Sequence, residues 1–230
     1  MGSLLADRCA EAVLGRLREQ DERQSSSMKE HVGSHLRAHR NDGSRYLQVD
    51  TEFYRDKVVA LDPDKCDFIY LQCRALQARR VVEVGTSFGV STIYLAAAVR
   101  DNARANGTEG GVVIATENEP SKVAAAKENF VEAGLAEVIE VREGDALNTL
   151  KDVGGPLDFV LMDTWIPIVL PVLRLLVAHL RPGSMVVCDN VGLFAHEYSE
   201  YTDFVRDPAN GFRSILMPYQ GGLEVSVRVP

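Results

Sequence analysis

The sequence predicts an α/β fold in which a mostly parallel β-sheet ends in an antiparallel pair of strands. Two observations predict it. From residue 80 onward, apolar β-branched runs alternate with amphipathic stretches, which is typical of βαβ units. The last two runs are instead joined by the hairpin-forming residues 218–222. The chain has 230 residues, 46% of them hydrophobic, so it is long enough to bury roughly 70% of its unfolded surface. A disordered protein is excluded.

The elements follow in order along the chain. Residues 1–60 are predicted to form a helical cap, because they are polar and carry two helical patterns but no strand of the buried type. Residues 61–230 are predicted to form the main domain. Its expected parallel strands are residues 81–84, 112–115, 138–141, 159–162 and 185–188. The expected helices are residues 90–103, 121–133 and 167–180, with a long loop at 101–111 and a final antiparallel pair at 214–217 and 223–229.

Composition excludes several classes of partner. With 33 acidic and 25 basic residues the net charge is −8, so the chain has no basic surface for nucleic acid or for an anionic membrane. The most apolar run, residues 165–180, is interrupted by charged residues and prolines and is shorter than the roughly 20 residues that span a bilayer. The first residues do not form a secretory signal. We therefore expect a cytoplasmic protein that binds a small molecule. The four cysteines have no paired spacing and are expected to be free thiols.

A glycine turn follows the first predicted strand, at the edge where open α/β sheets bind ligands. It contains Gly85, Ser87 and Gly89. A dinucleotide-binding loop needs glycine at position 87 to approach a pyrophosphate, and Ser87 carries a side chain instead. Glu83 would repel phosphate but suits an amine-bearing ligand such as the methionine part of S-adenosylmethionine. The loop therefore disfavours a nicotinamide oxidoreductase, although tight strand-to-helix packing alone would also explain its glycines.

Acidic residues end the second and third predicted strands. Glu117 is placed to accept hydrogen bonds from both ribose hydroxyls of a cofactor. It lies 28 residues after Gly89 (117 − 89), and we expect the loop at 101–111 to absorb the excess over the usual spacing of roughly 20 residues. Asp145 is placed to receive the amino group of an adenine. It is equally suited to cap the following short helix, and the two roles are compatible.

Three oxygen-bearing side chains end the fourth and fifth predicted strands: Asp163, Asp189 and Asn190. If these strands are neighbours, two carboxylates and an amide meet at the ligand-binding edge. Such a set suits magnesium or another hard divalent cation. The alternative interpretation is that acidic strand ends simply cap helices.

Taken together, these segments resemble the cation-dependent, S-adenosylmethionine-dependent O-methyltransferases of catechol and caffeoyl-CoA type, with their secondary-metabolism relatives. The resemblance covers roughly residues 61–230, and its carriers are residues 82–91, 115–117, 144–146, 158–165, 180–183 and 189–190. It implies a doubly wound, seven-stranded, Rossmann-like sheet of class I methyltransferase type, often in a homodimer. The implied cofactor contacts are Leu61, Glu83, Gly85, Ser87, Gly89, Ser91, Glu117, Asp145, Ala146, Asp163 and Trp165. The implied ligands of Mg²⁺ are Asp163, Asp189 and Asn190.

One departure from the family pattern concerns the base. The family has a lysine three residues after the first metal aspartate, and this chain has Ile166 there. Three accounts follow. In the first, the substrate is a phenol, enol or carboxylate that is acidic enough to need no base. In the second, His196 accepts the proton. In the third, the scaffold catalyses a non-transfer reaction. His31, His35 and His39 share one helix face, which we expect to be solvated, although one of them could reach the substrate.

Overall fold

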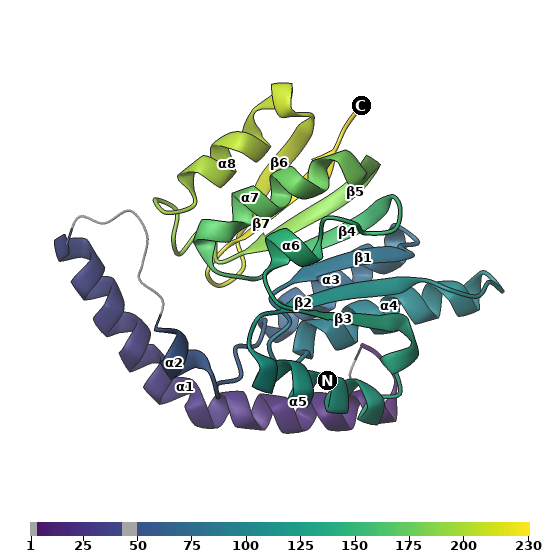
Figure 1. The fold of residues 1–230 in the computed structure, drawn as a ribbon, viewed down its shortest axis with the longest axis horizontal. Coiled ribbons are helices and arrows are strands. Elements are labelled where there is room, and N and C mark those ends of the chain that lie inside the picture. Colours follow the sequence, from purple (N-terminus) through teal and green to yellow (C-terminus); the bar gives the residue numbers. More distant parts are fainter. Residues whose placement is uncertain (1–3, 43–49) are drawn as a thin grey trace.

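The computed structural model describes residues 4–42 and 50–230, and it contains a seven-stranded sheet in the order β3-β2-β1-β4-β5-β7-β6 (Figure 1). The strands are β1 Arg80–Val84, β2 Val112–Glu117, β3 Ile139–Glu143, β4 Leu157–Met162, β5 Leu180–Asp189, β6 Phe212–Met217 and β7 Leu223–Arg228. The α-helices are α1 Arg8–Asp42, α2 Thr51–Tyr54, α3 Pro63–Ala75, α4 Val90–Ala105, α5 Pro120–Glu132, α6 Ala146–Thr149, α7 Ile166–Leu176 and α8 Ser199–Arg206. Short 3₁₀ turns are η1 Ala136–Val138, η2 Val177–His179 and η3 Pro208–Asn210.

The strand pairing confirms the predicted fold class. Strands β1 to β5 pair in parallel, whereas β7 is antiparallel to both β5 and β6. The chain order reverses between β1 and β4, so the edge beyond these two strands is a topological switch point, where folds of this kind bind ligands.

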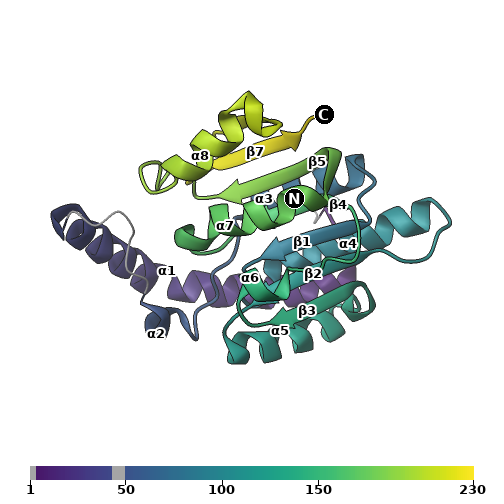
Figure 2. The ribbon, with the colours of Figure 1, turned by 45° about the horizontal axis from the view of Figure 1, so that its top comes forward.

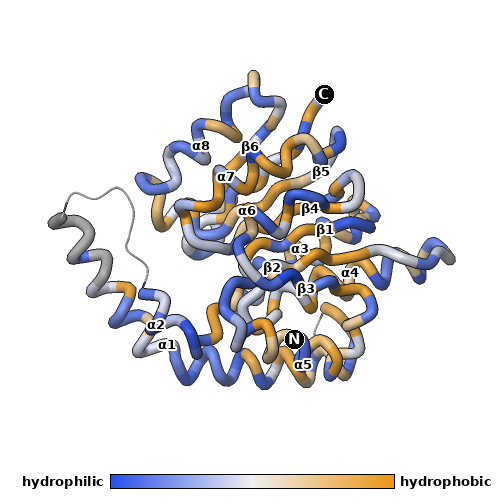
Figure 3. The backbone as a smooth tube through the Cα atoms, in the orientation of Figure 1, coloured by the Kyte–Doolittle hydropathy of each residue, from blue (hydrophilic) through white to orange (hydrophobic). Residues whose placement is uncertain are grey.

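Helices cover both faces of the sheet (Figure 2). Successive strand residues point to opposite faces. Accordingly, Val81 packs into the core beneath α1, α3, α4 and α5, while Val82 packs into the core beneath α6, α7 and α8. Figure 3 shows the consequence: apolar backbone segments gather in the central strands, and hydrophilic segments lie on the outer parts of the helices.

The N-terminal cap is one long helix followed by the short α2. Leu14 and Leu17 in the first half of α1 are buried in the same core as the sheet, and Arg16 donates to Asn129 of α5 at 3.0 Å. The later part of α1 projects from the body together with α2 (Figure 1). The first half of the cap is therefore packed onto the main domain.

Three local features differ from the sequence prediction. Helix α4 continues to Ala105, so the loop predicted at 101–111 is only its second half, and an extended helix accounts for most of the long spacing to Glu117. Helix α3 was not predicted, although Asp62 followed by Pro63 is a common helix start, with proline at the first helical position. In addition, the predicted helix 167–180 ends at Leu176, and β5 begins at Leu180.

No helix in residues 4–42 and 50–230 combines the length and the apolar character needed to cross a bilayer.

Candidate cofactor and metal site

The glycine turn lies against the end of β4. Gly85 has a φ of +98°, and a Cβ atom there would lie 1.9 Å from the carbonyl oxygen of Asp163. Gly89 has a φ of +94°, and a Cβ atom there would lie 2.3 Å from the ring of Phe130. Both positions therefore require glycine. The turn and the first expected metal ligand are side by side at the switch point.

Glu83 lies beneath this turn and is fully buried. Its carboxyl accepts hydrogen bonds from the hydroxyls of Thr86, Ser91 and Thr92. Burial raises the pKa of Glu83 to about 7, although the three hydroxyls oppose the shift. Glu83 and Ser91 therefore hold the turn on the strand, and the carboxyl carries a proton in part of the molecules near neutral pH.

Glu117 ends β2 and is tied to the same turn. Its Oε2 atom accepts the backbone N–H of Ser87 at 2.8 Å, while Oε1 accepts those of Asn118 and Glu119 at 2.8 and 2.9 Å. Ser87 has a φ of +50° and is 9% exposed. Three backbone amides thus fix the carboxylate that we expect at the ribose.

The register of β4 and β5 brings the expected metal ligands together. Met162 and Cys188 are partners across the two strands, so Asp163 and Asp189 follow at adjacent positions. Asp163 is partly buried, and desolvation of its carboxyl, with the nearby Asp189 and Glu83 carboxylates, holds its pKa well above the usual value. Asn190, at a φ of +62°, donates from Nδ2 to Oδ2 of Asp189 at 3.0 Å. The site therefore contains more buried negative charge than its immediate surroundings compensate.

Lys65 of α3 meets this negative charge, and the sequence did not reveal it. Its Nζ atom lies 2.7 Å from Oδ1 of Asp189 and 2.8 Å from Oδ2 of Asp62, and the side chain is 1% exposed. Burial lowers the pKa of Lys65, but the Asp189 and Asp62 carboxylates outweigh it and the net shift is upward. One sequence signal was present: Lys65 is in the first turn of its helix, where the helix dipole disfavours a cation.

The expected adenine contacts lie at the end of β3. Asp145 caps α6, accepting from the N–H of Leu147 at 2.9 Å and from Nδ2 of Asn148 at 3.1 Å. Its capping role is thus confirmed, and the side chain is exposed, whereas Ala146 is buried. Leu61, another expected cofactor contact, lies just before α3 and is 4% exposed. Its carbonyl oxygen accepts a hydrogen bond from the thiol of Cys66 at 3.4 Å.

Aromatic side chains connect the N-terminal cap to the end of β4. The ring of Trp165 lies 5.1 Å from that of Tyr54, measured between centroids, and Tyr54 lies 5.1 Å from Phe53. Phe53 stacks on His31 of α1 at 3.6 Å. His31 is therefore not on a solvated face as predicted: its side chain is 14% exposed. The side chains of His35 and His39 lie outside the described residues.

His196 and Ile166 are the two residues relevant to the missing base. Ile166 is the first residue of α7 and cannot accept a proton. His196 is exposed in the turn after β5, where its carbonyl accepts the N–H of Ser199. Within the described part of the chain, the structure gives no contact between its imidazole and Asp163, Asp189 or Asn190.

The chemistry of the three oxygen donors fits a hard divalent cation. The raised pKa of Asp163 shows that its ionised form lacks compensating positive charge, which such an ion would supply. No cluster of three His, Cys, Asp or Glu side chains suited to a metal occurs in the residues that the structure covers. The expected set differs from such a cluster because its third member is the amide of Asn190.

Known proteins resemble this chain over the residues that form the site. The model of the family described as "Methyltransferase domain" matches residues 82–191, which contain the glycine turn, Glu117 and all three expected metal ligands. Residues 82–191 are thus similar to methyltransferase domains. A relative called catechol O-methyltransferase, from Niastella koreensis, is 30% identical over 137 residues, which is 58% of each chain. Another of the same name, from Mycobacterium tuberculosis, is 37% identical over 134 residues, covering 58% of this chain and 57% of its own.

The alignments with these two curated relatives thus span less than three fifths of their length. Among solved structures, the O-methyltransferase from Bacillus cereus in complex with SAH has a TM-score of 0.64 at 23% identity, over 74% of this chain and 82% of its own. At that identity the likeness shows the fold alone. The resemblance to O-methyltransferases inferred from the sequence is confirmed by the family match and the two relatives. The Rossmann-like fold is confirmed by the sheet order and by the solved structure.

Proposed function

We propose that this chain transfers the methyl group of S-adenosylmethionine to an oxygen of a small metal-chelating molecule. The observation that carries the proposal is the position of Asp163, which touches the glycine turn through Gly85 and neighbours Asp189 through the strand register. A cofactor on the turn and a chelated substrate at the carboxylates would therefore lie next to each other. The names of the two relatives and the bound ligand of the Bacillus cereus protein support the same reaction.

Asp163, Asp189 and Asn190 would hold the divalent cation, which we infer to be Mg²⁺ or an ion of similar hardness. When bound, such an ion lowers the pKa of a chelated hydroxyl and fixes its position. The protein's own contribution is orientation. Methyl transfer from a sulfonium is a direct displacement, so Glu117 and the glycine turn must hold the cofactor in line with the oxygen that the strand ends position.

The proton of the substrate hydroxyl needs a separate account. Ile166 cannot accept it, and a general base typically contributes about 10² to 10⁴ in rate. Lys65 forms a buried ion pair with Asp189, and His196 is exposed. We therefore favour a substrate whose chelated group is already acidic, a phenol, enol or carboxylate. His196 remains the alternative acceptor.

The test is one set of incubations with methyl-labelled S-adenosylmethionine, Mg²⁺ and a panel of phenolic, enolic and carboxylic metabolites. We expect label in a product of at least one chelating substrate, and loss of that label with EDTA or in Asp189→Ala. Activity that survives both treatments would remove the metal from the mechanism. Binding of S-adenosylhomocysteine without label transfer to any chelating substrate would favour the non-transfer reaction instead.

Two variants distinguish the proton acceptors. With an acidic substrate, His196→Ala should retain most of the turnover, and the rate should be flat with pH above neutrality. A loss of about 10² or more in His196→Ala would assign the proton to the histidine. Ile166→Lys restores the family's residue and should extend turnover to less acidic hydroxyls.

The remaining expectations concern assembly and location. We propose a homodimer that binds neither nucleic acid nor membranes and resides in the cytoplasm. Analytical ultracentrifugation measures the oligomeric state, and a monomer at micromolar concentration would contradict the proposed homodimer.

A further inference from the structure

A second lysine is buried beside the glycine turn. Lys122, in the first turn of α5, is 7% exposed, and its Nζ atom lies 3.4 Å from the hydroxyl oxygen of Ser87. The same Nζ is 5.8 Å from the centre of the Phe88 ring. The ammonium group is thus directed at the turn on which the proposed cofactor would lie, and not at solvent.

Lys122 and Lys65 occupy equivalent places in their helices. Each follows an acidic residue and a proline in the pattern acid-Pro-x-Lys: Asp62 to Lys65 at the start of α3, and Glu119 to Lys122 at the start of α5. In both helices the dipole disfavours a cation at this end. A buried lysine at such a position therefore needs an anion.

The two lysines differ in the anions that they find. Lys65 contacts two carboxylates within 2.8 Å. At the start of α5, the equivalent acidic residue, Glu119, does not contact the lysine. Its carboxylate accepts hydrogen bonds from the N–H and the hydroxyl of Ser121, and its Oε2 atom lies 3.6 Å from Nε of Arg55. Among the described residues, no carboxylate oxygen comes within the 4 Å of an ion pair with Lys122. Within the described part of the chain, its charge therefore has no carboxylate in direct contact.

The surrounding carboxylates do not replace such a partner. Burial lowers the pKa of Lys122, and the more distant Glu117, Glu119 and Asp56 raise it by less, so the net shift is downward. The first of these carboxylates is already engaged, because Glu117 accepts three backbone N–H groups. The desolvation of the Lys122 ammonium group is therefore only partly compensated by the protein. An anionic ligand oxygen beside Ser87 would compensate the rest.

The proposed cofactor has a single anionic group. Its adenine and ribose are neutral, and its sulfonium and amine are cationic, so the carboxylate of its methionine part is the one group that an ammonium attracts. Resting on the cofactor proposed above, we propose that Lys122, with the hydroxyl of Ser87, binds the methionine carboxylate of S-adenosylmethionine. Lys122 then selects ligands that carry this carboxylate over those that lack it.

The test removes the charge from each side of the contact. Decarboxylated S-adenosylmethionine differs from the cofactor by the loss of that carboxylate. Titration calorimetry gives the Kd of both ligands for the wild type, Lys122→Gln and Lys122→Met. We expect the wild type to bind the complete cofactor at least about tenfold more tightly, the range of a hydrogen bond to a charged group, and both variants to lose most of that preference. The Kd of the decarboxylated ligand should change less than about threefold.

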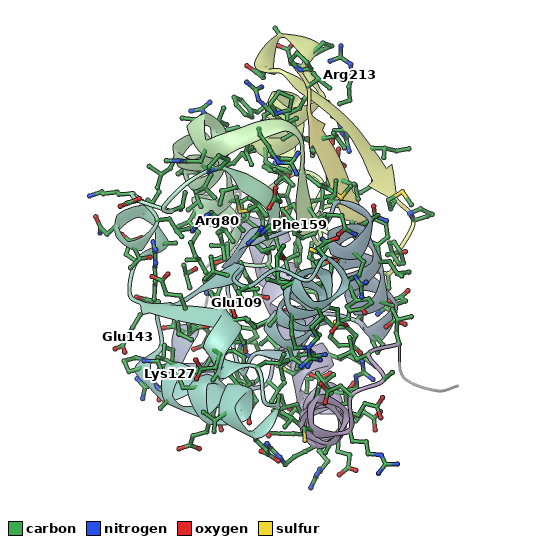
Figure 4. The ribbon with its side chains drawn as sticks, turned by 90° about the vertical axis from the view of Figure 1, so that its right-hand side faces the viewer. Arg80, Glu109, Lys127, Glu143, Phe159 and Arg213 are labelled. Carbon is green, nitrogen blue, oxygen red and sulfur yellow. The ribbon has the colours of Figure 1, made fainter. Side chains whose placement is uncertain are left out.

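Lys127→Gln is the matched control, because Lys127 is an exposed lysine of the same helix (Figure 4). It should leave both Kd values unchanged. Circular dichroism checks the fold, and whichever of the two Lys122 variants folds suffices. The proposal would be overturned if the Lys122 variants bound both ligands more weakly by the same factor. It would also be overturned if the wild type bound the two ligands equally tightly. If the wild type bound neither ligand, the proposed cofactor itself would be wrong.

Discussion

Lys65 and Asp189 form a buried ion pair, with Nζ 2.7 Å from Oδ1, across a sequence separation of 124 residues. The family resemblance puts a lysine at position 166 of this chain, where Ile166 stands. The structure instead has a lysine on α3, in contact with one of the expected metal ligands. Lys65 thus supplies one positive charge to a group of carboxylates that includes Asp62, Asp163 and Asp189.

We predict that Lys65→Met lowers the free energy of unfolding by about 3 kcal/mol in EDTA, because removing one partner of a buried pair leaves the other uncompensated. Mg²⁺ should recover part of this loss, since the ion would neutralise the same carboxylates. Urea unfolding with and without Mg²⁺ measures both values. Lys127→Met, at an exposed position, is the control. An equal loss in both conditions would show that Lys65 and the metal site are not coupled.

The glycine turn gives a steric prediction. Gly85→Ala would put a Cβ atom 1.9 Å from the carbonyl oxygen of Asp163, whereas Gly134→Ala, at a φ of +68°, meets no atom within 4 Å. Gly134→Ala should cost about 1 kcal/mol, the backbone strain alone. Gly85→Ala should cost at least about 2 kcal/mol more, because the turn must move away from β4. Chemical unfolding of the two variants compares them, and similar losses would contradict the close approach.

Glu83 gives a prediction on pH. Its pKa is about 7 in the folded chain against an ordinary value of 4.5. A group whose pKa rises on folding contributes stability that is fully present below its unfolded pKa and is lost as the pH rises through the folded value. Relative to Glu83→Gln, which stays neutral, the wild type should therefore lose about 3 kcal/mol between pH 4.5 and pH 7.5. Urea unfolding of both proteins across this range measures the difference. A constant difference would mean that folding does not raise the pKa of Glu83.

Glu117 is expected to bind the ribose, and its neighbour across the sheet offers a control. Glu143 is its partner in the β2–β3 register and is exposed at the same edge (Figure 4). Glu117→Ala should weaken the binding of S-adenosylhomocysteine by about 1 to 3 kcal/mol, the scale of a lost hydrogen bond to a charged group. Glu143→Ala should change it little. Calorimetric titration of the two variants gives the Kd of S-adenosylhomocysteine for each. Equal weakening in both would mean that the effect comes from the loss of negative charge at this edge and not from a contact of Glu117.

The strand ends were predictable because each belongs to a local pattern. A buried run followed by Glu117, Asp163 or Asp189 needs only the alternation of strands and helices to place its last residue at the ligand-binding edge. The register of β4 and β5 then makes Asp163 and Asp189 neighbours. No part of this inference requires the conformation of a side chain.

The two lysines were not predictable in this way. Lys65 reaches Asp189 from an element that the sequence pattern did not reveal, and the contact depends on the tertiary packing of α3. Lys122 is in a predicted helix, but its burial depends on the path of the glycine turn. His31 was misassigned for a related reason: its helix face is covered by Phe53 of α2.

The only tryptophan of the chain offers a spectroscopic test of the site. Trp165 comes two residues after Asp163 and is 43% exposed, with its ring 5.1 Å from that of Tyr54. A ligand bound at the end of β4 would exclude water from the indole and change its emission. We predict that S-adenosylhomocysteine shifts or quenches the fluorescence saturably, with the same Kd as calorimetry gives. Tyr54→Leu should alter the emission of the free protein by removing the neighbouring ring. Emission that stays constant while calorimetry reports binding would mean that the cofactor does not lie beside Trp165, and that the cap contact through Tyr54 is separate from the cofactor.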